Sequence, residues 1–75
     1  MYMNQDFAKH TGERIKFIRV SKKVSRNAIA KAIGVNPSTV TRYENGNITI
    51  PLEMALKIAQ VLGVNVYDFV QGFKY

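Results

Sequence analysis

Glycines at 34, 46 and 63 each follow a short segment in which apolar residues recur at helical spacing. Glycines at these positions indicate the ends of a series of short helices. Gly34 in particular fits the position just after a helix, where a positive φ angle is needed and a Cβ is penalised. Residues 6–23 form a longer amphipathic pattern, although Gly12 within it weakens a helix by about 1 kcal/mol relative to Ala.

Helix start signals agree with these stops. Ser25 is a good N-cap for a second helix, and Asn36 followed by Pro37 predicts the start of a third. Asn65 can cap a last short helix. Pro51 opens a fourth helix whose predicted apolar face is Leu52, Ala55, Leu56, Ala59 and Leu62. Five short helices and no convincing strand predict one all-α domain over residues 1–75.

Composition excludes several kinds of function. The 75 residues include no Cys and one His, His10, so we expect no disulfide, no thiol catalysis, no metal site and no cofactor. The five Asp and Glu residues form no visible acid–base pair, and a Gly-rich phosphate loop is missing, so we expect no enzyme. Without a long apolar run or a signal-like start, the chain is expected to be soluble and cytoplasmic.

The basic charge is one-sided and points to a polyanionic partner. The net charge is +6, and residues 1–35 carry all of that excess, because residues 36–75 contain three basic and three acidic side chains. Nucleic acid is the first candidate and an acidic membrane surface the second. A membrane surface would need the apolar face of the first helix, which the core requires.

Residues 26–45 carry the most specific pattern. Ala30 is small where the next helix would pass closest, Gly34 makes the turn four residues later, and Val40 supplies an apolar contact from the following helix. This spacing is typical of a helix-turn-helix motif.

From about Gly12 to Phe69 the sequence resembles the Cro and phage-repressor type of helix-turn-helix, also called the XRE family. The resemblance rests on the segments 25–30, 34–46, 51–59 and 62–64. Its most specific tag is Tyr43-Glu44-Asn45-Gly46. The resemblance implies a compact five-helix, lambda-repressor-like domain of bacterial or phage origin, which binds pseudo-palindromic DNA operators as a dimer and associates with the nucleoid when bound.

On the third helix, Val40 and Tyr43 are expected to face the core. Four polar residues then face outward at i, i+3, i+4 and i+7: Ser38, Thr41, Arg42 and Asn45. A helix in the DNA major groove needs such a face, with short hydroxyls near base edges and one long side chain. Ordinary solvated helix surface remains the alternative for Ser38 and Thr41.

Three positions depart from the family pattern. Arg26 stands where relatives often have Gln, and we expect it to clamp a phosphate. The loop at 47–50 is uncharged where relatives are often basic. Pro37 replaces a base-reading side chain and offers apolar contact only. We assign base reading to Pro37, Ser38, Thr41 and Arg42. We assign contacts to the DNA backbone to Lys22, Lys23, Arg26, Thr39, Asn45 and Asn47.

Two further contacts are expected. Glu44 and Arg19 both turn toward the core side of their helices, so they should pair, as the resemblance also implies. Residues 64–75 hold more apolar side chains than one short helix can bury. We assign Val66 and Phe69 to the core, and we assign a homodimer contact to Tyr67, Val70, Phe73 and Tyr75. The alternative is a tail that folds back over the core.

The sequence therefore predicts a double-stranded DNA-binding transcriptional regulator. The motif lies at about residues 26–45 and a dimerisation segment at 64–75. The alternative function is a protein-interaction module of antitoxin or adaptor type that uses the same fold.

Overall fold

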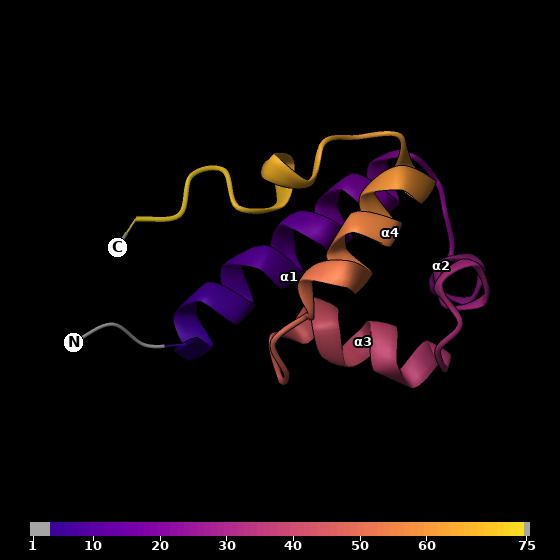
Figure 1. Cartoon of the computed structure of the whole chain (residues 1–75), viewed down its shortest axis with the longest axis horizontal. Coiled ribbons are helices and arrows are strands. Elements are labelled where there is room, and N and C mark those ends of the chain that lie inside the picture. The colour runs from indigo at the N-terminus through magenta and orange to yellow at the C-terminus, as the bar shows by residue number, and fades with distance from the viewer. Residues whose placement is uncertain (1–3, 75) are drawn as a thin grey trace.

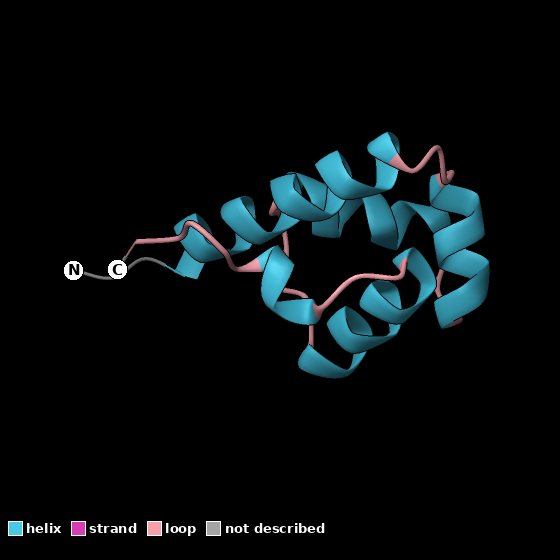
Figure 2. Ribbon diagram, turned by 90° about the horizontal axis from the view of Figure 1, so that it is seen from above, coloured by secondary structure: helices cyan, strands magenta, loops and turns pink. Residues whose placement is uncertain are grey.

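The computed structural model describes residues 4–74 as four α-helices followed by one short 3-10 helix (Figure 1). The elements are α1 (Asn4–Ser21), α2 (Arg26–Ile33), α3 (Pro37–Asn45), α4 (Leu52–Leu62) and the 3-10 helix η1 (Val66–Phe69). Figure 2 shows only helices and connecting loops within this described part of the chain. The all-α class is thus confirmed.

The helices enclose one core. α3 packs against both α1 and α2, α4 packs against α2, and η1 joins α1 to α4. One fully buried side chain comes from each element: Ile15, Ile29, Val40, Ile58 and Phe69. Between residues 4 and 74, no helix is both long and apolar enough to cross a membrane.

The fifth helix is the main correction to the predicted fold. An α-helix was expected after Asn65, but η1 is a single 3-10 turn of four residues. Asn65 does cap it, in a reciprocal capping box with Asp68. At its end the N–H of Val70 bonds to the carbonyl of Tyr67 at 3.0 Å, the i to i+3 bond of a 3-10 helix. So short a segment does not offset the cost of nucleating an α-helix.

The first helix ends two residues before its predicted end at residue 23. The N–H of Lys23 bonds to the carbonyl of Val20 at 2.9 Å, and the N–H of Val24 bonds to that of Arg19 at 3.1 Å. This pair of bonds is a Schellman ending, which places Lys23 in the left-handed region at φ 60°. The sequence carries no glycine there to signal the stop.

The caps of α2 and α3 differ. Ser25 accepts a hydrogen bond from the N–H of Ala28 at 3.0 Å, as predicted. Asn36 is the N-cap of α3 and Pro37 its first residue, as predicted, but the side chain of Asn36 makes no cap hydrogen bond. Its backbone carbonyl instead accepts the N–H of Thr39 at 2.9 Å. Because Pro37 has no N–H, the start of α3 has one fewer hydrogen-bond donor that a cap would have to satisfy.

The buried face of α4 is also shifted from the prediction. Ala55, Ile58, Ala59 and Leu62 are buried, whereas Leu52 and Leu56 are 70% and 50% exposed. The two alanines allow close packing of α4, and the stripe centred on them leaves both leucines on the solvent side.

Gly12 explains why α1 and α3 pack so closely. A Cβ at this position would overlap the carbonyl oxygen of Tyr43 and would lie 2.6 Å from that of Glu44. The two backbones therefore touch directly. What reads in the sequence as a weak point of a helix is a requirement of its packing.

Gly12→Ala should lower the free energy of unfolding by about 1–3 kcal/mol, because overpacking outweighs the better helix propensity of alanine. Thermal and urea unfolding followed by circular dichroism would measure this change. Gln60→Ala, at an exposed position on α4, is the control and should stay within about 0.5 kcal/mol. A Gly12→Ala variant as stable as the wild type would contradict the packing argument.

Candidate nucleic-acid interface

The turn between α2 and α3 sets the angle of the candidate reading helix. Gly34 ends α2 in the left-handed region at φ 79°. The carbonyl of Ala30 accepts the N–H groups of both Gly34 and Val35, at 2.9 and 3.0 Å. Ala30 is 1% exposed and Val40 is fully buried, so a small residue meets an apolar one where the helices approach. This geometry is a helix-turn-helix.

The outward side of α3 is polar. Pro37, Ser38, Arg42 and Asn45 are exposed, and Thr41 is half-buried. The hydroxyl of Thr41 donates to the carbonyl of Pro37 at 3.3 Å, so its oxygen faces the surroundings as an acceptor beside its methyl group. Thr39 is half-buried, and Asn47 is exposed in the following loop.

A carboxylate with two guanidinium groups lies behind this face. The Nε of Arg19 donates to Oε2 of Glu44 at 2.5 Å, and its Nη2 donates to Oε1 at 3.1 Å. Both side chains are buried, at 8% and 0% exposed. The structure thus brings Arg19 and Glu44 together from α1 and α3. The Nη1 of Arg19 also donates to the carbonyl of Val24 at 2.8 Å, which ties down the loop before α2.

Arg26 is the second partner of Glu44, and sequence reasoning missed this contact. Its Nε donates to Oε1 of Glu44 at 2.9 Å, while its side chain remains 39% exposed. Arg26 is the first residue of α2 and Glu44 lies near the end of α3, so no spacing along one helix could indicate the pair. The guanidinium is anchored at Nε, and its terminal nitrogens are the part that a phosphate can reach.

The other predicted backbone contacts lie near this cluster in the chain. Lys22 and Lys23 are exposed just after α1, between Arg19 and α2. With Arg26 they place three positive charges near the amino end of α2. Helix amino ends favour anions, so this region suits a phosphate.

The predicted dimer residues differ in exposure and in their contacts. Tyr67 is 63% exposed. Val70 and Phe73 are half-buried. The ring of Phe73 meets that of Phe7 on α1 edge-on, with centroids 5.1 Å apart. Phe73 thus packs within its own chain, as in the folded-back alternative, and Tyr75 lies outside the described residues.

The two C-terminal side chains assigned to the core do contact it. Phe69 is fully buried, and Val66 packs against the core, as predicted. His10 also holds the tail, because its Nε2 lies 2.7 Å from the carbonyl of Gln71.

No group of three or more acidic, His or Cys side chains within residues 4–74 is placed to hold a metal ion.

Known proteins share this architecture. The family model described as Helix-turn-helix matches residues 15–69. A protein from Methanocella arvoryzae, named as an HTH-type transcriptional regulatory protein, is 40% identical over 52 residues, which are 68% of this chain and 15% of that protein. An uncharacterized HTH-type transcriptional regulator from Methanocaldococcus jannaschii is 31% identical over 73% of this chain and 83% of its own length.

A solved structure agrees with these relatives. The restriction-modification controller protein C.AhdI from Aeromonas hydrophila superposes with a TM-score of 0.78 at 26% identity, covering 83% of this chain and 94% of that one. The present chain thus spans most of two of these relatives and a small part of the Methanocella protein.

Glu44→Ala should lower the free energy of unfolding by about 3–5 kcal/mol, because it leaves Arg19 buried without its partner. The melting temperature measures this loss. Glu53→Ala is the matched control: Glu53 pairs with Lys57 at 3.6 Å on the exposed side of α4, so its loss should cost less than about 1 kcal/mol. Equal melting temperatures for the two variants would contradict a structural role for the Glu44 cluster.

Proposed function

This chain belongs to the XRE type of the helix-turn-helix family of DNA-binding transcriptional regulators, and we propose that it is a repressor-like protein that binds a pseudo-palindromic operator as a homodimer. The observation that carries the proposal is the exposed polar face of α3. Basic side chains lie on the same motif: Arg26, which Glu44 holds, and the exposed Lys22 and Lys23. A side chain on this face has no core role to fulfil, so it is available to a ligand. The proposal places the protein in the cytoplasm, on the nucleoid when bound to DNA.

In the proposed complex, α3 enters the major groove with its amino end first. Arg42 is the longest exposed side chain on this face and can donate two hydrogen bonds to the O6 and N7 atoms of guanine. Ser38 is short enough to approach a base edge directly. Thr41 offers an acceptor and a methyl group, and Pro37 adds apolar contact that suits a thymine methyl group.

Contacts to phosphates position the helix. Lys22, Lys23 and the terminal nitrogens of Arg26 provide positive charge at the amino side of the motif. Because Glu44 holds Arg26 by its Nε, the guanidinium loses less freedom when it meets a phosphate than an unanchored arginine would. Thr39, Asn45 and Asn47 are assigned to the same backbone-contacting set.

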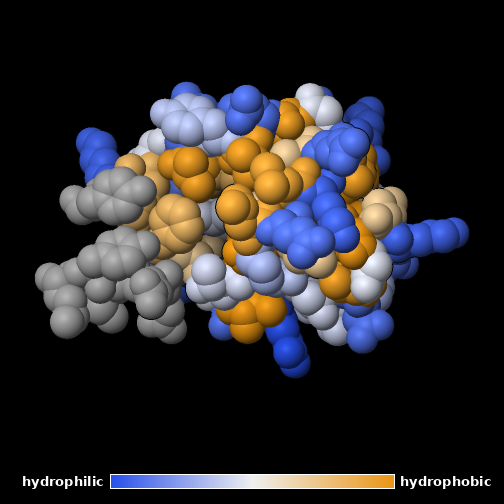
Figure 3. Space-filling model, viewed as in Figure 1, coloured by the Kyte–Doolittle hydropathy of each residue, from blue (hydrophilic) through white to orange (hydrophobic). Residues whose placement is uncertain are grey.

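An exposed apolar surface on α4 and η1 supports the proposed homodimer. Leu52 and Tyr67 are 70% and 63% exposed, and Leu56 is 50% exposed. Leu52 and Val70 border an apolar hollow of about 180 Å³ between α4, η1 and α1. Apolar side chains gather on the face of the molecule that carries α4 and η1 (Figure 3).

This surface revises the residues that we assign to the dimer. Phe73 packs on Phe7, so we propose that Tyr67 and Val70 from the predicted set are joined by Leu52 and Leu56. A two-fold contact through this surface would pair two copies of α3, which a pseudo-palindromic operator requires. The same surface would serve the alternative function, a module that binds a different protein.

Selection from a random double-stranded DNA library should enrich one motif, and Arg42→Ala should weaken binding to it by about 1–3 kcal/mol while relaxing the preference at one position. Lys57→Gln, which also removes one positive charge but lies beside Glu53 on α4, is the control and should leave affinity unchanged. A wild-type chain that enriches no motif at moderate salt would count against the proposal.

Tyr67→Glu should convert the dimer into a folded monomer with weaker operator binding, because the carboxylate would be buried unpaired in the contact. Sedimentation measures the oligomeric state, and circular dichroism checks the fold. Phe17→Glu is the control, since Phe17 is similarly exposed, at 66%, on the outer side of α1. A Tyr67→Glu chain that still sediments as a dimer would exclude this surface. A wild-type monomer that binds another protein through it would favour the alternative.

A further inference from the structure

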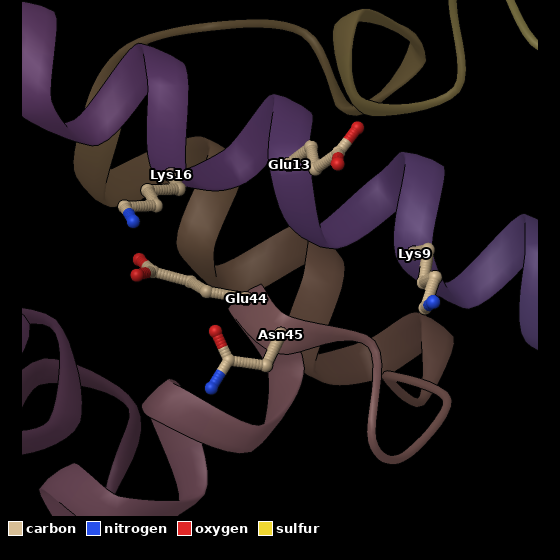
Figure 4. A pocket seen from close by; sticks show the side chains of 5 residues that line it. All are labelled: Lys9, Glu13, Lys16, Glu44 and Asn45. Atoms are coloured by element: carbon tan, nitrogen blue, oxygen red, sulfur yellow. The ribbon is translucent and has the colours of Figure 1, made fainter.

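A polar hollow of about 260 Å³ lies between α1 and α3, and Asn45 is the one residue of its lining that was assigned to DNA above. Its lining residues are Lys9, Glu13, Lys16, Glu44 and Asn45 (Figure 4). We propose that Lys9 and Lys16, with the side-chain amide of Asn45, bind phosphate groups of the DNA backbone here. This inference rests on the proposed function and adds two residues of α1 to its binding surface.

The hollow borders the reading face of α3. Asn45 is exposed on the same side of α3 as Ser38 and Arg42, and it also lines the hollow. A DNA strand that flanks the groove occupied by α3 would therefore pass next to Lys9 and Lys16. These two residues are seven positions apart on α1, which is about 10 Å along a helix, so they can reach different phosphates.

Backbone packing holds Lys9 in place. A Cβ on Gly46 would lie 2.7 Å from the Cα of Lys9, so α1 rests directly on the end of α3. The backbone of Lys9 is thus held beside the loop at 46–51, and its ammonium group extends from that position. That loop contains no Lys or Arg. The cations on this side of α3 are supplied by α1 instead.

The charge balance in the hollow favours an anion. Glu44 already meets two guanidinium groups, those of Arg19 and Arg26. Glu13 is the other acidic residue in the lining, and its carboxylate turns away from Glu44 and Asn45, whereas Lys9 and Lys16 extend toward α3 (Figure 4). Lys9, Lys16 and Glu13, together with Glu44 and its two arginines, carry a net charge of +2, which a phosphate would lower.

The site also extends the positive charge along α1. Lys22 and Lys23 follow α1 and Arg26 begins α2, whereas Lys9 and Lys16 lie on α1 itself. Arg26 reaches Glu44 near the carboxyl end of α3. Cations from both parts of the chain would meet phosphates beside α3.

The test measures affinity against salt concentration for Lys9→Gln, Lys16→Gln and the double variant. Two duplexes of equal length are used, one carrying the selected motif and one unrelated. Each single change should reduce the slope of log K against log salt by about 0.9 for each bound subunit, and the double change by about 1.8 for each bound subunit. Affinity should fall by the same factor on both duplexes, because phosphates carry no sequence information.

Lys57→Gln is the matched control, since Lys57 lies on the exposed side of α4 beside Glu53 and should leave the slope unchanged. Lys9→Arg should retain the wild-type slope. Wild-type binding with unchanged slopes in Lys9→Gln and Lys16→Gln would overturn this inference alone. A wild-type chain that binds neither duplex would overturn the proposed function as well.

Discussion

The buried carboxylate of Glu44 is the group on which the arrangement of the first three helices depends. Its side chain is fully buried near the end of α3, and guanidinium groups from α1 and α2 meet it at 2.5 and 2.9 Å. An ionised carboxylate away from water is strongly unfavourable unless it is paired. Any displacement of α1 or α2 that separated these groups would leave a buried charge, so the helices stay in one relative position.

The backbones of α1 and α3 also touch directly, and one end of this contact lies next to the proposed DNA surface. Gly12 allows the backbones to touch, and Gly46 lies against Lys9 at the other end of that contact. The side of α1 that faces α3 thus serves two purposes. Arg19 stabilises the core, while Lys9 and Lys16 border the hollow beside Asn45. The residues assigned to the dimer contact lie on α4 and in and after η1, whereas those assigned to DNA lie on α1, α2, α3 and the adjoining loops.

Much of the fold could be predicted from local signals, while the candidate site was predictable in part. The stop at Gly34, the cap at Ser25 and the outward polar face of α3 depend on residues within a few positions of one another, and the structure has all three. Arg26 was expected to clamp a phosphate, and its bond to Glu44 was not anticipated. Phe73 was assigned to a dimer contact, and in the structure it packs on Phe7. Both contacts join residues far apart in the chain.

The sequence by itself determined the helix limits set by glycine and Ser25, the helix-turn-helix, and the family. These depend on hydrogen bonds and periodicity within one or two turns, where neighbouring residues have little choice of partner. Only the tertiary structure decided that Leu52 is exposed and that Lys9 lies beside Gly46. Each outcome depends on which surfaces of separate helices meet, and this is set by the volume and charge of side chains that the chain brings together from a distance.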